Sequence, residues 1–152
     1  MDDWKHDHLG NQIIILSNQV KHYLHQAAEV EGISGSQSRI LHYISECSKK
    51  TEVYQKDVEE FFYLRRSTVT QTLQTMEKNG LIRRSSVARD ARLKKLVLTD
   101  TGRELHEKTK DMIDILEEQT IEGIAKEDLD TFYRVIDQLK SNVKNMLGET
   151  SC

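Results

Sequence analysis

The sequence predicts a mainly α-helical fold that carries one small β-hairpin. Apolar residues recur at helical spacing along most of the 152 residues, which indicates several amphipathic helices. The segment 65–99 combines a short helix with two apolar runs separated by polar and basic residues, which is typical of a hairpin. No proline or serine-rich linker divides the chain, so we expect a single domain over 1–152.

Composition excludes several classes of protein. With 37% hydrophobic and 31% charged residues, the chain is neither disordered by composition nor membrane-spanning, and apolar runs such as 13–16 are too short to cross a bilayer. The polar start, 1–10, does not resemble a signal peptide, so a cytoplasmic location is expected. Two cysteines, Cys47 and Cys152, are too few for a disulfide framework or a zinc motif, which predicts reduced thiols.

The first part of the chain predicts two helices and a short strand. The first helix should cover 9–31, where apolar residues follow the helical period, and Gly32 should end it. Ser34 and Gln37 fit a capping box at the start of a second helix over 37–47. Val53-Tyr54 could form a one- or two-residue strand that pairs with the hairpin.

Two short helices should then follow in close succession. A third helix is expected over 55–62, packing Val58 and either Phe61 or Phe62 against the next helix. The tight connection 63–66 leads into that next helix, which should end at Asn79-Gly80, because glycine tolerates the left-handed conformation of a helix cap. Two short helices joined by about four residues form a helix-turn-helix.

The second of these helices has two different faces. Val69, Leu73 and Met76 recur at i, i+4 and i+7 and should pack inward. The opposite face carries hydroxyls and carboxamides, which can hydrogen-bond base edges, where an ordinary solvated helix alternates acids with bases. Its members are Ser67, Gln71, Gln74, Thr75 and Lys78. This composition indicates a surface that reads nucleic acid.

The hairpin that follows is strongly basic. Leu81-Ile82 should begin its first strand, the segment 85–90 should form its turn, and 96–98 should form its second strand. Within 65–95 there are nine lysines and arginines against two acids, a local charge of +7 in a chain whose net charge is −3. The rest of the chain is therefore acidic, at −10, which confines phosphate attraction to one face. A hairpin of this kind beside a recognition helix is a wing.

Two further helices complete the chain. A long helix should begin either with a capping box from Thr101 to Glu104 or with Thr99 as its N-cap, and continue to about Gly123. A last helix is expected over 126–147. The terminal helices carry more apolar residues than one small domain covers, and a second copy of the chain is the economical partner. A two-fold dimer would place paired recognition helices one DNA turn apart, about 34 Å.

With these elements in place, the sequence resembles the multiple-antibiotic-resistance regulator (MarR) family of bacterial winged helix-turn-helix repressors. The wing carries the most specific match, Asp90-Ala91-Arg92 followed by 96–99 and Gly102. The segments 67–70 and 73–82 also match the family's recognition helix and its exit. The resemblance covers nearly the whole chain and implies a homodimer bound to a pseudo-palindromic operator and released by a small ligand, metal or oxidant.

The resemblance divides the chain and, together with the residue chemistry, names its contacts. It implies a DNA-binding lobe at 34–99, with dimerisation helices at 9–31 and 101–147. On the recognition helix the expected DNA-binding residues are Arg65, Arg66, Ser67, Thr68, Thr70, Gln71 and Gln74, and on the wing they are Arg84, Arg89, Arg92 and Lys94. By the same resemblance, Asp90 holds an arginine in position. A small-molecule effector is expected, but the sequence predicts neither its identity nor the residues that bind it.

Other readings remain open beside this one. His22, His25 and Glu29 share one helix and could belong to a metal sensor, and Cys47 could be a redox sensor, although no tight set of ligands appears. A winged helix that binds a protein instead of DNA is the alternative from another class. No enzyme motif, resident metal or cofactor is expected, because the sequence lacks a nucleophile elbow, a phosphate-binding glycine loop and metalloprotease spacing.

Overall fold

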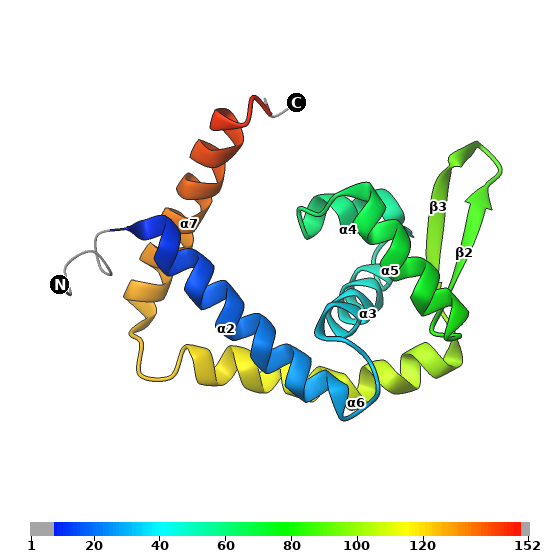
Figure 1. Cartoon of the computed structure of the whole chain (residues 1–152), viewed down its shortest axis with the longest axis horizontal. Helices are drawn as coiled ribbons and strands as arrows, with labels where there is room; N and C mark the ends of the chain where they lie inside the picture. The colour runs from blue at the N-terminus through cyan, green and yellow to red at the C-terminus, as the bar shows by residue number, and fades with distance from the viewer. Residues whose placement is uncertain (1–7, 150–152) are drawn as a thin grey trace. The chain divides into compact units, whose positions relative to one another are not determined.

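The computed structural model describes residues 8–149 and confirms a mainly helical fold with a small antiparallel sheet (Figure 1). The chain forms two compact units, Met1–Asp114 and Ile115–Cys152. In chain order the elements are α2 (Leu9–Glu29), α3 (Gly35–Ser48), β1 (Val53–Tyr54), α4 (Gln55–Phe61), α5 (Arg66–Lys78), β2 (Ile82–Val87), β3 (Asp90–Leu98), α6 (Asp100–Thr120) and α7 (Lys126–Met146). The expectation for Cys152 falls outside the described residues, and the prediction of a single domain stays a prediction.

Local signals set several helix ends as the sequence predicts. The Ser34 hydroxyl accepts a hydrogen bond from the backbone N–H of Gln37, and the Gln37 carboxamide accepts one from the N–H of Ser34, each at 3.1 Å. This capping box starts α3 at Gly35, two residues earlier than predicted. At the end of α5, Gly80 adopts a φ of 71°, the left-handed conformation expected of a glycine there.

The sheet has the strand order β1-β3-β2, and both pairings are antiparallel. Val53 pairs with Leu96, which confirms that the short strand joins the hairpin. The prediction of a turn over 85–90 is wrong, because only Ala88 and Arg89 form the turn. Ser85 and Ser86 instead pair with Lys95 and Lys94, since polar residues on an exposed two-stranded ribbon are compatible with strand pairing.

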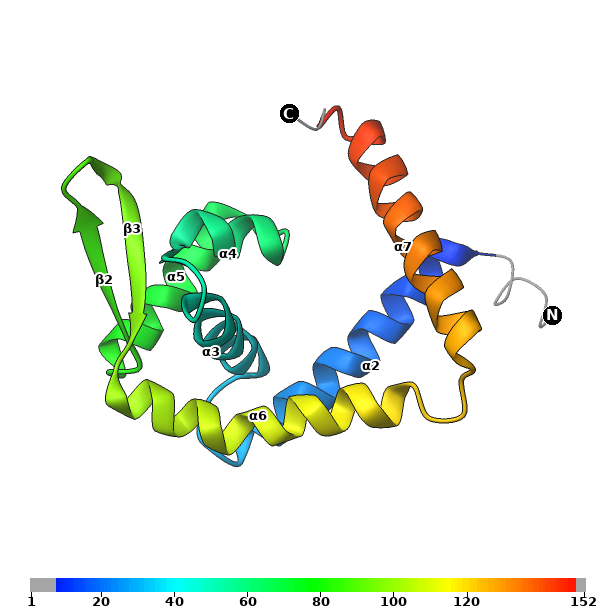
Figure 2. The same cartoon turned by 180° about the vertical axis from the view of Figure 1, so that it is seen from behind.

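The core of the first unit lies between α3, α4, α5 and the sheet, and the hairpin stands beside α4 and α5 in both views (Figures 1 and 2). Val69, Leu73 and Met76 are completely buried, as the helical period predicts. The expected packing from α4 is made by Val58, which is also completely buried, and by Phe62, which packs against the core. Phe61 is 66% exposed, so the second of the two predicted alternatives holds.

The start of α6 is fixed against the entry to the wing. The Thr99 hydroxyl accepts a hydrogen bond from the N–H of Gly102 at 3.0 Å, so Thr99 caps this helix and Thr101 does not. A Cβ added at Gly102 would lie 2.0 Å from the carbonyl oxygen of Leu81, which only glycine avoids. His106 and Thr109 continue the buried stripe of α6 within the first unit. Residues 34–99, which we call the winged lobe, and the first half of α6 therefore pack as one structure.

Candidate nucleic-acid interface

The exposed face of α5 carries the predicted reading surface. Arg65 is the N-cap of α5, and the side chains of Arg66, Ser67, Thr68, Gln71 and Gln74 are all exposed. The Thr72 and Thr75 hydroxyls donate to the carbonyl oxygens of Thr68 and Gln71, one turn earlier, at 2.9 and 3.1 Å. Because these threonines bond within the helix, the two glutamine carboxamides are the longest uncharged polar groups that this face presents.

Thr70, another predicted DNA-contact residue, lies at the contact between α4 and α5. It is half-buried, and its hydroxyl accepts a hydrogen bond from Gln55 Nε2 at 2.8 Å. The same amide nitrogen of Gln55 lies 3.0 Å from a carboxylate oxygen of Glu59, to which it also donates. This buried polar link orients α4 against α5. The role of Gln55 could not be predicted from the sequence, because a glutamine at the start of a helix is ordinary.

The arginine at the tip of the wing is held by the short strand β1. Arg89 Nη2 donates to the Tyr54 hydroxyl at 2.9 Å, and that hydroxyl donates in turn to a Glu52 oxygen at 2.6 Å. Lys95 forms an ion pair with the other Glu52 oxygen. The hydrogen bonds from Lys95 and then Tyr54 lower the pKa of Glu52, while donation to Glu52 raises the pKa of Tyr54. Arg89 is thus oriented before any ligand arrives.

Arg84 differs from the other wing residues because it is engaged with α5. Its backbone N–H and its Nε each donate to Glu77 at 2.9 Å, and its Nη2 lies 2.8 Å from the same carboxylate. The bond from the backbone N–H, followed by those from the guanidinium, lowers the pKa of Glu77. This bidentate pair fixes the base of the wing to the recognition helix.

Asp90 and Lys94 shape the outer part of the wing. An Asp90 oxygen accepts a hydrogen bond from the backbone N–H of Arg92 at 2.9 Å. Asp90 therefore holds the backbone of an arginine, whereas the resemblance implied only that it holds an arginine in position. The ammonium group of Lys94 donates to the Ser86 hydroxyl at 2.6 Å, across the hairpin. The guanidinium of Arg92 is exposed at the same end of β3.

A cavity of about 310 Å³ lies where α4, α5 and β3 meet. It brings together Arg66 from the recognition helix with Arg92 and Lys94 from the wing, which are 26 to 28 positions later in the chain. Lys56 also lines it. Its place at the cavity could not be predicted from the sequence, because a lone lysine on α4 resembles a solvated surface residue. Four cations face one acid, Glu59, so the cavity suits a phosphate group.

The alternative sensing residues are dispersed. His22 and His25 are exposed on α2, and within 8–149 no three His, Cys, Asp or Glu residues are grouped as metal ligands. Cys47 is a half-buried free thiol. It lies beside Tyr43, whose pKa is raised to about 12, first by burial and then by Cys47. Among the described residues, no helix combines the length and apolar character that crossing a membrane requires.

Fold and site together define a winged helix-turn-helix protein with a polar recognition helix and a basic wing. A family profile described as the MarR family matches residues 31–93. The crystal structure of the transcription regulator MarR from Oenococcus oeni PSU-1 is 30% identical, covers 88% of this chain and 99% of its own, and superposes with a TM-score of 0.77. The chain belongs to the MarR family of transcription regulators, which are not enzymes.

Two further solved structures share the fold. The Staphylococcus aureus MepR–DNA complex is 23% identical, with coverage of 93% of this chain and 95% of that chain and a TM-score of 0.72. Heme-free PefR is 28% identical, with coverage of 86% and 96% and a TM-score of 0.65. One of these two structures of the same fold is therefore a complex with DNA.

Proposed function

We propose that this chain represses transcription by binding a pseudo-palindromic DNA operator as a homodimer, and that a small-molecule effector releases it. The observation that carries the proposal is the convergence of cations from the recognition helix and the wing on the cavity between α4, α5 and β3. Arg66, Arg92 and Lys94 gather there from two elements, next to a helix that offers few charges and many hydrogen-bonding groups. The S. aureus MepR–DNA complex has the same fold, which is consistent with this arrangement.

The proposal gives the site residues different roles. Ser67, Thr68, Gln71 and Gln74 would read base edges in the major groove, while Arg65, Arg66 and Lys56 would contact phosphates. Arg89 and Arg92 would approach the adjacent minor groove, with Lys94 close to the backbone. Thr70 and Arg84 would act mainly through Gln55 and Glu77, which they bind in the free protein.

A homodimer is supported by apolar side chains that a single chain leaves exposed. On α2 the run from Ile13 to Leu16 is 42 to 59% exposed, and α7 has no buried residue. A ligand that favours a dimer with differently spaced recognition helices by about 3 kcal/mol would weaken operator binding roughly a hundredfold. Release by such a population shift needs no contact between effector and DNA.

Fluorescence anisotropy with DNA from upstream of the chain's own gene would test the proposal, with scrambled DNA of equal length as the control. Arg92→Ala should weaken binding to every DNA sequence. It should also reduce the slope of log affinity against log salt concentration by about one, because one phosphate contact is lost. Gln71→Ala should weaken the native site by about 1–3 kcal/mol and relax its base preference. Lys49→Ala, at an exposed position after α3 that belongs neither to the proposed interface nor to the dimerisation helices, is the matched control and should bind like the unmodified protein. Equal, weak and salt-independent binding to both DNAs would contradict the proposal and favour the protein-interaction alternative.

A further inference from the structure

The outward face of α5 carries no charge along its middle. Every residue from Ser67 to Thr75 is uncharged, and the charged side chains lie at the two ends of the helix. Arg66 lines the cavity between α4, α5 and β3, and Glu77 is paired with Arg84. Guanine presents two acceptors in the major groove and is read most often by an arginine or a lysine. The middle of this face therefore offers no side chain of the kind that selects guanine.

The groups that this face offers instead are the carboxamides of Gln71 and Gln74. Both residues are exposed, and within 8–149 neither carboxamide has a hydrogen-bond partner, unlike that of Gln55, which binds Thr70 and Glu59. A carboxamide combines one acceptor with an amino donor, and adenine presents the complementary pair, its N6 amino group beside the N7 acceptor. Guanine would place its O6 acceptor against the carboxamide oxygen. The two glutamines therefore suit adenine.

The spacing of the two glutamines matches that of stacked bases. Three residues of an α-helix rise by about 4.5 Å, and successive bases of one DNA strand are about 3.4 Å apart. Gln71 and Gln74 also lie on the same side of α5, because residues three apart are neighbours on a helix. Glutamine side chains are long enough to absorb this difference of about 1 Å, so the two carboxamides can contact neighbouring base pairs at the same time.

Thr75 adds an apolar group beside Gln71. It is exposed one turn after Gln71, and its hydroxyl donates to the Gln71 carbonyl oxygen at 3.1 Å. Since the hydroxyl proton is used within the helix, Thr75 can donate to a base only by breaking this bond, whereas its methyl group takes part in no polar contact. Threonine methyl groups contact the C5-methyl group of thymine, which is the partner of adenine. Gln71 and Thr75 together therefore match both members of an A·T pair.

From these observations we infer that α5 selects two adjacent A·T pairs in each half of the operator, with Gln71 and Gln74 bound to the adenines and the Thr75 methyl group in contact with a thymine. This selection rests on the proposed function, in which α5 enters the major groove. Thr75 is then a specificity-determining residue, although its hydroxyl makes no contact with DNA. The cations around the cavity between α4, α5 and β3 set the register, since phosphate contacts position a helix without reading sequence.

Enrichment of bound duplexes from a randomised DNA library by the full chain identifies the preferred half-site. It should contain two adjacent A·T pairs, of which Gln71→Ala no longer selects one and Gln74→Ala no longer selects the other. Lys49→Ala should select the same sequence as the unmodified protein. Unchanged selection in both glutamine variants, or G·C pairs at the positions that they no longer select, would overturn the inference and leave the proposed function intact. Enrichment of no sequence at all would contradict the proposed function and the inference with it.

Modified bases in the selected duplex then test each contact separately. Replacing the adenine at the Gln71 position by 7-deazaadenine removes one of two hydrogen bonds and should weaken binding about fivefold, but should not affect Gln71→Ala. Replacing the contacted thymine by uracil removes one methyl group and should weaken binding about fourfold, but should not affect Thr75→Ser, which keeps the hydroxyl. Full affinity for the 7-deazaadenine duplex would overturn the adenine contact. Equal sensitivity of Thr75→Ser and the unmodified protein to uracil would overturn the role of Thr75.

Discussion

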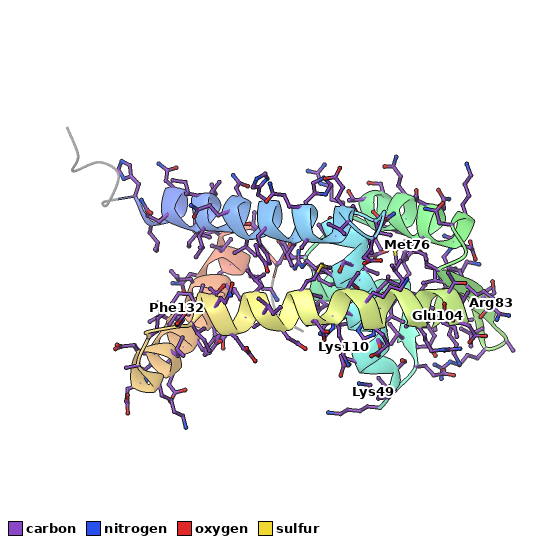
Figure 3. The ribbon with its side chains drawn as sticks, turned by 90° about the horizontal axis from the view of Figure 1, so that it is seen from below. Lys49, Met76, Arg83, Glu104, Lys110 and Phe132 are labelled. Carbon is purple, nitrogen blue, oxygen red and sulfur yellow. The ribbon has the colours of Figure 1, made fainter. Side chains whose placement is uncertain are left out.

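The winged lobe and helix α7 use their apolar residues in opposite ways. In the lobe, Leu41, Ile44, Leu73 and Met76 are completely buried by helices and strands of the same chain. On α7 no residue is buried, and Phe132, which projects from it (Figure 3), is 50% exposed. The lobe therefore contains its own core, whereas α7 is an amphipathic helix whose apolar face is available to another surface.

The first half of helix α6 is buried like the lobe, whereas its second half is exposed like α7. Gly102, His106 and Thr109 are buried, and Leu105 and Met112 pack against the lobe's core. Ile115, beyond the boundary of the first unit, is 44% exposed. The helical period continues without interruption, so the difference arises from what lies against each turn and not from the pattern itself.

The largest expected effect separates the two regions by stability. Leu73→Ala should lower the free energy of unfolding by about 2–5 kcal/mol, because it leaves a cavity in a closed core. Phe132→Ala should change it by no more than about 0.5 kcal/mol in dilute solution, since it removes an exposed side chain. Urea denaturation followed by circular dichroism measures both. Similar losses for the two variants would show that α7 is as deeply packed as the lobe.

A second prediction concerns the partner of α7. Phe132 and Val143 lie three turns apart on one face, and the double variant Phe132→Glu with Val143→Glu should weaken self-association at least about tenfold, or 1.4 kcal/mol, because charges would enter an apolar contact. Analytical ultracentrifugation provides the measurement, and Arg134→Glu is the control for added acid on the same helix. A double variant that associates as before would place the dimer contact elsewhere.

The smallest expected effect concerns the pH dependence of stability, through the contact between His106 of α6 and the lobe. His106 is 3% exposed and its Nε2 lies 3.2 Å from Nδ1 of His42 on α3. Burial, followed by the charge of His42, lowers the pKa of His106, although Glu107 and Glu46 act against this shift and Lys110 reinforces it.

The unfolded chain therefore binds this proton more readily than the folded one. The contribution of neutral His106 to stability is complete above its ordinary pKa of about 6.5 and is lost as pH falls through the lowered pKa of the folded state. Thermal unfolding between pH 8 and pH 5 should show a smaller loss of stability for His106→Gln than for the unmodified chain. His22→Gln, at an exposed position on α2, should retain the full pH dependence. An unchanged slope in His106→Gln would mean that this contact does not titrate with folding.

Much of the fold and part of the site could be predicted from the sequence. The inward stripe of α5, the Ser34–Gln37 capping box and the pairing of β1 with the hairpin all agree with the structure. The exposed face of α5 also agrees, because the helical period that buries Val69 and Leu73 must expose Gln71. The length of the wing turn was predicted wrongly, since serine suits a turn and an exposed strand equally well.

Features that depend on neighbours a few residues apart could be predicted from the sequence: where helices start and end, which face of each is apolar, and where positive charge is concentrated. The pairing of distant polar groups, by contrast, is visible in the tertiary structure alone. Arg89 bonds Tyr54 across 35 positions, and His42 meets His106 across 64. The tertiary structure also shows that Lys56 joins Arg66 and Arg92 around one cavity. Such contacts depend on how helices and strands pack, and no short-range period in the chain encodes that packing.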